Sequence, residues 1–102
     1  SGGNQQKLVL ARVLERHPRL IVAVQPTRGL DIGATEYVRS ALLEQCTRGC
    51  AVLLISTELD EVLALSNRIS VMYNGQLSPP LERDAVTRDQ LGLLMGGRSL
   101  AG

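Results

Sequence analysis

The sequence predicts an α/β fold, and the prediction rests on two short apolar runs separated by a segment of helical spacing. The runs are residues 20–24 (LIVAV) and 51–55 (AVLLI). Between them, apolar residues recur every three or four positions after Asp31, a helix-capping residue type, until Gly49 ends the pattern. A strand, a helix and a second strand in this order form a right-handed crossover with a parallel strand pair. Because continuous apolar runs are typical of strands covered on both faces, we expect both strands to be buried throughout.

Helices are expected on either side of this crossover. Residues 5–16 are predicted to form a helix that is apolar around most of its circumference and that ends before Pro18. After the second strand, Ser56 or Thr57 is expected to cap a short helix over residues 58–65.

The carboxyl-terminal part predicts a hairpin and a last helix. Residues 68–73 alternate as a strand does, and Asn74-Gly75 predicts a two-residue turn back through residues 76–78. Pro79-Pro80 should end the sheet region, and Thr87 with Gln90 has the spacing of a capping box for a final helix. We therefore expect a mainly parallel sheet with a terminal hairpin in residues 1–78, and a loop and helix in residues 79–102.

Composition excludes several classes of function. The formal net charge is +1 and aromatic residues make up 2% of the 102 residues, so a nucleic-acid partner is not expected. No apolar run approaches the roughly 20 residues of a membrane span, and the polar first residues do not resemble a signal peptide. Cys46 and Cys50 are too few for a disulfide framework, and no second pair completes a metal site.

Three places in the predicted fold could hold chemistry. Loops that follow Val24 and residue 55 lie at the carboxyl ends of parallel strands, where open α/β sheets bind ligands. The third is the start of the first helix, where Ser1, Gly2 and Gly3 offer backbone amides without side-chain obstruction. Such a helix amino terminus attracts anions, although a glycine pair alone is a weak signal.

The order of four segments is more specific than any one of them. SGGNQQK, a dozen residues of helix, LIVAVQPTRGLD and ISTELDE resemble the ATPase cassettes of ABC transporters from Ser1 to about Gly75, and more loosely to Gly97. The resemblance implies a P-loop NTPase-like fold. It also implies that Ser1, Gly2, Gly3 and Asn4 form the signature that closes on ATP across a cassette pair, and that Asp31 belongs to the D-loop. Asn4 replaces the glutamine usual in the family.

Three departures from the family pattern indicate a degenerate site, here called the silent site. Val24 stands where the family has the aspartate associated with magnesium, Gln25 where it has the catalytic glutamate, and Thr57 where it has the switch histidine. Valine offers no oxygen to a hard cation and is expected to pack in the core. Glutamine can orient a water molecule but cannot take its proton, and threonine carries no positive charge. Thr57 also suits the plain role of a helix cap.

The resemblance leads to a functional expectation. The chain should be a piece of an ATP-binding subunit of an ABC importer for simple sugars or nucleosides, with Gln25 in QPTRGLD favouring nucleosides. Its signature would serve the ATP and magnesium held by a second cassette, while transmembrane permease subunits would keep it at the cytoplasmic side of the membrane. No GxxxxGK[ST] loop is present, so the chain alone should not hydrolyse ATP and its uncovered sheet should self-associate. The alternative is a structural or dimerisation module that never contacts nucleotide.

Overall fold

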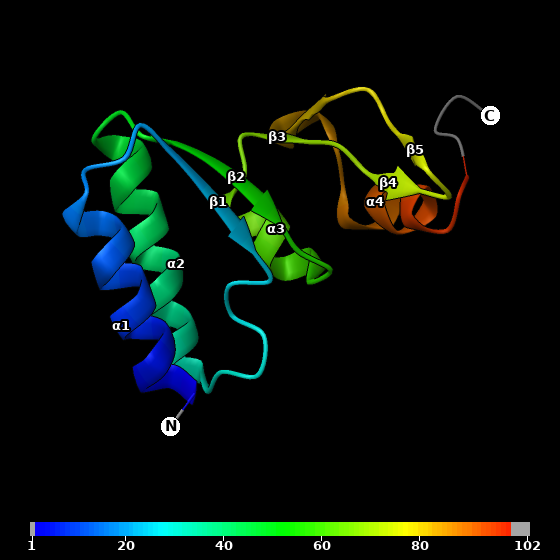
Figure 1. Ribbon diagram of the computed structural model, residues 1–102. Helices are drawn as coiled ribbons and strands as arrows, with labels where there is room; N and C mark the ends of the chain where they lie inside the picture. The colour runs from blue at the N-terminus through cyan, green and yellow to red at the C-terminus, as the bar shows by residue number, and fades with distance from the viewer. Residues whose placement is uncertain (1, 99–102) are drawn as a thin grey trace. The chain divides into compact units, whose positions relative to one another are not determined.

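The structure, a computed structural model, describes residues 2–98 and divides into two compact units, Ser1–Thr57 and Glu58–Gly102. The first unit contains α1 (Gly2–Glu15), β1 (Leu20–Val24), α2 (Ile32–Thr47) and β2 (Ala51–Ile55) (Figure 1). The second contains α3 (Leu59–Leu65), four two-residue strands, a 3-10 turn (Arg83–Ala85) and α4 (Arg88–Met95). Helices and strands alternate in the first unit, so the predicted α/β class is confirmed.

The crossover of the first unit has the predicted topology. β1 and β2 pair in parallel, with Leu20 opposite Ala51 and Val24 opposite Ile55. Both helices lie against one face of this pair (Figure 1). The Asp31 side chain accepts a 2.8 Å hydrogen bond from the Ala34 amide and caps α2, as expected. The first helix begins three residues earlier than expected because the glycines of the opening segment take up helical conformation.

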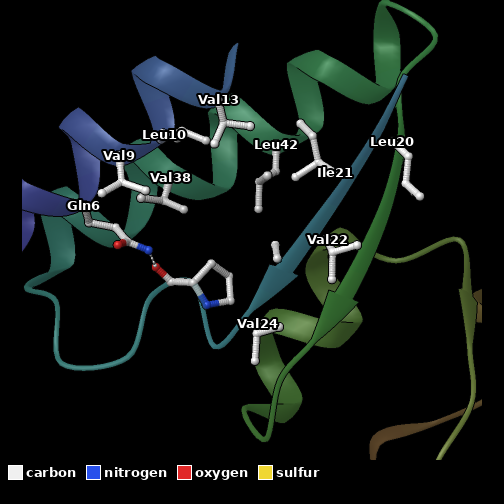
Figure 2. Close-up of a pocket in the computed structure, with 12 residues that line it drawn as sticks. Gln6, Val9, Leu10, Val13, Leu20, Ile21, Val22, Val24, Val38 and Leu42 are labelled. Atoms are coloured by element: carbon white, nitrogen blue, oxygen red, sulfur yellow. Dashed lines mark hydrogen bonds between the residues drawn. The ribbon is translucent and has the colours of Figure 1, made fainter. Parts of the chain in front are cut away.

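β1 is buried on one face only, and β2 is at most partly covered on one face, which corrects the expectation that both strands are buried throughout. Ile21 and Ala23 are buried, whereas Leu20, Val22 and Val24 are 58%, 55% and 60% exposed. Successive side chains of a strand point to opposite faces, and α1 and α2 cover only the face of Ile21. Figure 2 shows Ile21 directed toward Leu42 of α2, with Val22 and Val24 directed away. Val24 therefore does not pack in a core within the described residues.

The second unit contains the expected hairpin. β4 (Met72–Tyr73) pairs with β5 (Gln76–Leu77), and the turn residues Asn74 and Gly75 have φ angles of +51° and +78°. Two positive φ angles in a row are the signature of a type I′ turn, which suits Asn-Gly. Thr87 and Gln90 form the predicted capping box at the start of α4.

Two details of the second unit differ from the sequence-based expectations. The strand expected over residues 68–73 is interrupted into β3 (Arg68–Ile69) and β4, and β6 (Leu81–Glu82) pairs with β3 after the two prolines. Proline removes only its own amide, so Leu81 and Glu82 remain able to form a ladder, and Leu81 packs on the core of Ile69, Val86 and Leu91. Residues 81–94 thus share a core with the preceding segment, while the division of the cassette at residue 78 stays a prediction.

The cap of α3 also differs. Glu58 occupies the capping position and makes no side-chain cap bond, so neither Ser56 nor Thr57 caps this helix. The hydroxyl of Thr57 is instead engaged by Gln25, which removes it from the helix terminus.

Candidate functional site

The parallel pairing of β1 and β2 brings two predicted silent-site residues together. Val24 lies opposite Ile55, so Gln25 and Thr57 leave the sheet at the same edge. The Gln25 amide donates a 2.7 Å hydrogen bond to the Ile55 carbonyl and continues the ladder by one residue. Gln25 also has a φ of +46°, an unusual conformation for a residue with a side chain that costs about 1–3 kcal/mol. Strand pairing therefore holds Gln25 in a bent conformation at the end of β1.

Thr57 binds both ends of the Gln25 side-chain amide, through its hydroxyl and through its backbone amide. Gln25 Nε2 donates to Thr57 Oγ1 at 3.3 Å, and the Thr57 backbone amide donates to Gln25 Oε1 at 3.3 Å. Sequence analysis placed both residues at the site but missed this mutual contact. The parallel register places Gln25 beside the segment that follows Ile55, and Thr57 is the second residue of that segment. The arrangement holds a polar pair without a general base.

Val24, the third silent-site residue, lies one position earlier and contributes no polar atom. Its side chain is 60% exposed on the uncovered face of the strand pair. No group of three or more His, Cys, Asp or Glu residues within the described part of the chain is placed to hold a metal ion. Cys46 and Cys50 are both free thiols. A magnesium ion would find no hard oxygen ligand at Val24.

The signature segment lies at the start of α1, one turn before Gln6. Ser1 falls outside the described residues, while Gly2, Gly3 and Asn4 form the first turn of α1. A Cβ atom built on Gly2 would meet nothing within 4 Å, so this position faces open space. A Cβ atom on Gly3 would lie 3.0 Å from the Cβ of Ala34 in α2. The two glycines therefore have different surroundings, which the sequence alone did not indicate.

Asp31 and the signature segment both contact Ala34 of α2. The Asp31 carboxylate caps the Ala34 amide at 2.8 Å, and the Ala34 side chain is the one that Gly3 approaches. The amino termini of α1 and α2 lie side by side (Figure 1). The structure thus places Gly3, in the same helical turn as Gly2 and Asn4, beside Ala34 and its Asp31 cap, and it pairs Gln25 with Thr57.

An apolar groove of about 300 Å³ runs between α1, α2 and β1 (Figure 2). Gln6 of α1 makes a polar contact with the loop after β1 in this groove, where Gln6 Nε2 donates a 2.7 Å hydrogen bond to the Pro26 carbonyl. Sequence analysis did not single out Gln6. Gln6 is partly buried whereas Gln5 is exposed, and the sequence pattern does not distinguish these two neighbouring glutamines.

No membrane-crossing helix occurs among residues 2–98, since none is both long and apolar enough.

Comparison with known proteins identifies the class of fold. No protein-family model matches the chain. A solved ATP-binding cassette of an ABC transporter in its ADP conformation superposes on 94% of this chain and 36% of its own, with a TM-score of 0.72 and 26% identity. A nucleotide-free cassette superposes with a TM-score of 0.72 and 32% identity over 80% of this chain and 32% of its own. The fold is therefore that of about a third of an ABC ATPase cassette.

The relatives found by sequence are import ATP-binding proteins. The chain is 50% identical over 97 residues to the guanosine import ATP-binding protein NupO of Bacillus subtilis. The matched residues make up 95% of this chain and 19% of NupO. The chain is equally identical over 97 residues to the glucose import ATP-binding protein TsgD13 of Haloferax volcanii, covering 95% of this chain and 18% of the relative. Over nearly its whole length the chain is therefore similar to a part of import ATP-binding proteins and of ABC transporter cassettes. It spans about a fifth of the length of these curated relatives.

Proposed function

We propose that this chain supplies the signature of an ABC importer to an ATP site completed by a second cassette, while its own site is silent. In a head-to-tail cassette pair, residues 1–4 would face the phosphates held by the partner. The chain would form part of an ATP-binding subunit, bound to transmembrane permease subunits at the cytoplasmic side of the membrane. Names of relatives at 50% identity support nucleosides and sugars as the imported substrates.

The observation that carries the proposal is the open surrounding of Gly2 at the first turn of α1. The first amides of a helix have no acceptor within the helix, and the positive end of the helix dipole adds to their attraction for an anion. Because no atom lies within 4 Å of a Cβ at Gly2, a phosphate could approach these amides from this side. ATP supplies the terminal phosphate and this chain supplies the amides that bind it.

The silence of the chain's own site is supported by chemistry and by geometry. Gln25 cannot accept a proton from water, and its amide is occupied at both ends by Thr57. Val24 offers no ligand for magnesium. Under this proposal magnesium would be held at the partner's site, together with a competent phosphate loop.

A chimera tests the proposal against the alternative of a structural module without nucleotide contact. The 97 matched residues of NupO would be replaced by those of this chain, and guanosine import would be measured with the chimera and with its Gly2→Asp variant. A carboxylate at Gly2 repels the phosphate, so import should fall about a hundredfold or more, the scale seen when one oxyanion donor is lost. Equal import by the two chimeras, at equal amounts of folded protein, would favour the structural module.

A further inference from the structure

Two contacts tie the loop of residues 25–31 to the signature helix, one at each end of the loop. At the first end, Gln6 Nε2 of α1 donates to the Pro26 carbonyl at 2.7 Å, in a partly buried position (Figure 2). At the second end, Gly3 of α1 approaches Ala34, the residue whose amide is capped by Asp31. The loop carries Gln25 of the silent site at one end and Asp31 at the other.

The loop is internally braced between these contacts. The Arg28 amide donates to the Gln25 carbonyl at 3.2 Å, and the Leu30 amide donates to the Thr27 carbonyl at 3.1 Å. Thr27 is 8% exposed, and Gly29 has a φ of +75° that favours glycine at this bend. Because the loop of residues 25–31 has internal hydrogen bonds and a contact with α1 at each end, we expect it to move together with α1.

Gly3 is needed here because α1 and α2 pack closely at Ala34, and not because the backbone at Gly3 needs an unusual conformation. Carbon atoms in van der Waals contact lie about 3.5–4.0 Å apart, so a Cβ on Gly3 at 3.0 Å from Ala34 would force α1 and α2 apart. Ala34 is 5% exposed, which leaves it little room to move. One turn further along the helices, Lys7 Nζ lies 4.9 Å from the centre of the Tyr37 ring and continues the same interface.

We propose that Gln6 and Ala34 are positioning residues that fix loop 25–31 to the signature helix, so that Gln25 and Asp31 move as one body with Gly2. The functional consequence rests on the proposed role of the signature: a rearrangement at the silent site would reach the amides of Gly2 through these two contacts. Of the two glycines, Gly2 faces the ligand and Gly3 sets the separation of the helices.

Amide hydrogen exchange in the nucleotide-free chain tests the first contact. Gln6→Glu keeps the size of the side chain but replaces the donor by a carboxylate that repels the Pro26 carbonyl. Exchange of the Arg28 and Leu30 amides should become about threefold to tenfold faster, the range that corresponds to one net hydrogen bond. Gln5→Glu is the matched control, because Gln5 is exposed and the added charge is the same.

The second contact is tested by a residue swap. Gly3→Ala should speed exchange of the Leu30 and Thr35 amides, and Gly3→Ala combined with Ala34→Gly should restore the parent rates because one Cβ is merely moved across the interface. Gly2→Ala is the matched control, since its added Cβ meets nothing. In every variant, unchanged exchange in the β1–β2 ladder distinguishes a local effect from global unfolding.

The proposal predicts faster loop exchange in Gln6→Glu and Gly3→Ala, with rescue by the swap and parent rates in both controls. Parent-like loop exchange in Gln6→Glu and Gly3→Ala would overturn it, and so would a swap variant as fast as Gly3→Ala alone. Because no nucleotide is present, failure here leaves the import result with Gly2→Asp untouched, and the two proposals can fail separately.

Discussion

Neighbouring residues of β1 should respond very differently to an introduced carboxylate. Val24 is 60% exposed, so about 40% of its surface is covered, whereas Ala23 is 9% exposed on the face of the helices. Full burial of a valine contributes about 1.5–3 kcal/mol, so Val24→Asp should lose about 0.6–1.2 kcal/mol of burial. The lower strand propensity of aspartate adds up to about 1 kcal/mol. We expect Val24→Asp to reduce the free energy of unfolding of this chain by about 1–2 kcal/mol.

Ala23→Asp is the matched comparison, because it places the same carboxylate on the covered face of the same strand. A carboxylate buried without a partner costs more than about 3 kcal/mol, enough to unfold a small domain. Urea denaturation followed by circular dichroism measures both variants against the parent. If Val24→Asp were as damaging as Ala23→Asp at a concentration where the chain is monomeric, the face of Val24 would be covered within one chain, and burial of β1 on one face only would be wrong.

Two further predictions follow from the same first unit. The chain alone should show no magnesium-dependent ATP hydrolysis above background in a steady-state assay, because it has no phosphate loop and no general base; turnover that disappears in Gln25→Ala would contradict this. The uncovered strand face, with Leu20, Val22 and Val24 more than half exposed, should drive self-association at micromolar concentration. Sedimentation velocity should show dimers or larger species that Val22→Lys reduces, and a monomeric parent chain would refute the prediction.

Local sequence signals predicted the elements that depend on one or two residues. The cap at Asp31, the Asn74-Gly75 turn and the Thr87–Gln90 capping box all follow from short-range hydrogen bonding or backbone preference, and all are present. The fold class followed from the spacing of apolar runs in the first unit.

Features that depend on tertiary pairing were not predictable from the chain alone. Apolar runs do not tell whether one face or two will be covered, so the exposure of Val24 was missed. The hydroxyl of Thr57 could equally well cap a helix or accept a hydrogen bond from another side chain. Only the pairing of β1 with β2 brings Gln25 close enough to be that donor. The different surroundings of Gly2 and Gly3 likewise come from the packing of α1 on α2.

The central claim is that the signature of this chain is active in a cassette pair and that its own site is not. One assay tests both halves: ATP hydrolysis and guanosine import by the NupO chimera, with Gly2→Asp and Gln25→Ala measured side by side. Gly2→Asp should reduce both activities about a hundredfold or more, since a negative charge and a side chain enter the place of the phosphate. Gln25→Ala should stay within a few-fold of the parent chimera, because Gln25 belongs to the silent site. Loss of activity in Gln25→Ala together with tolerance of Gly2→Asp would show that the active and silent halves had been assigned the wrong way round.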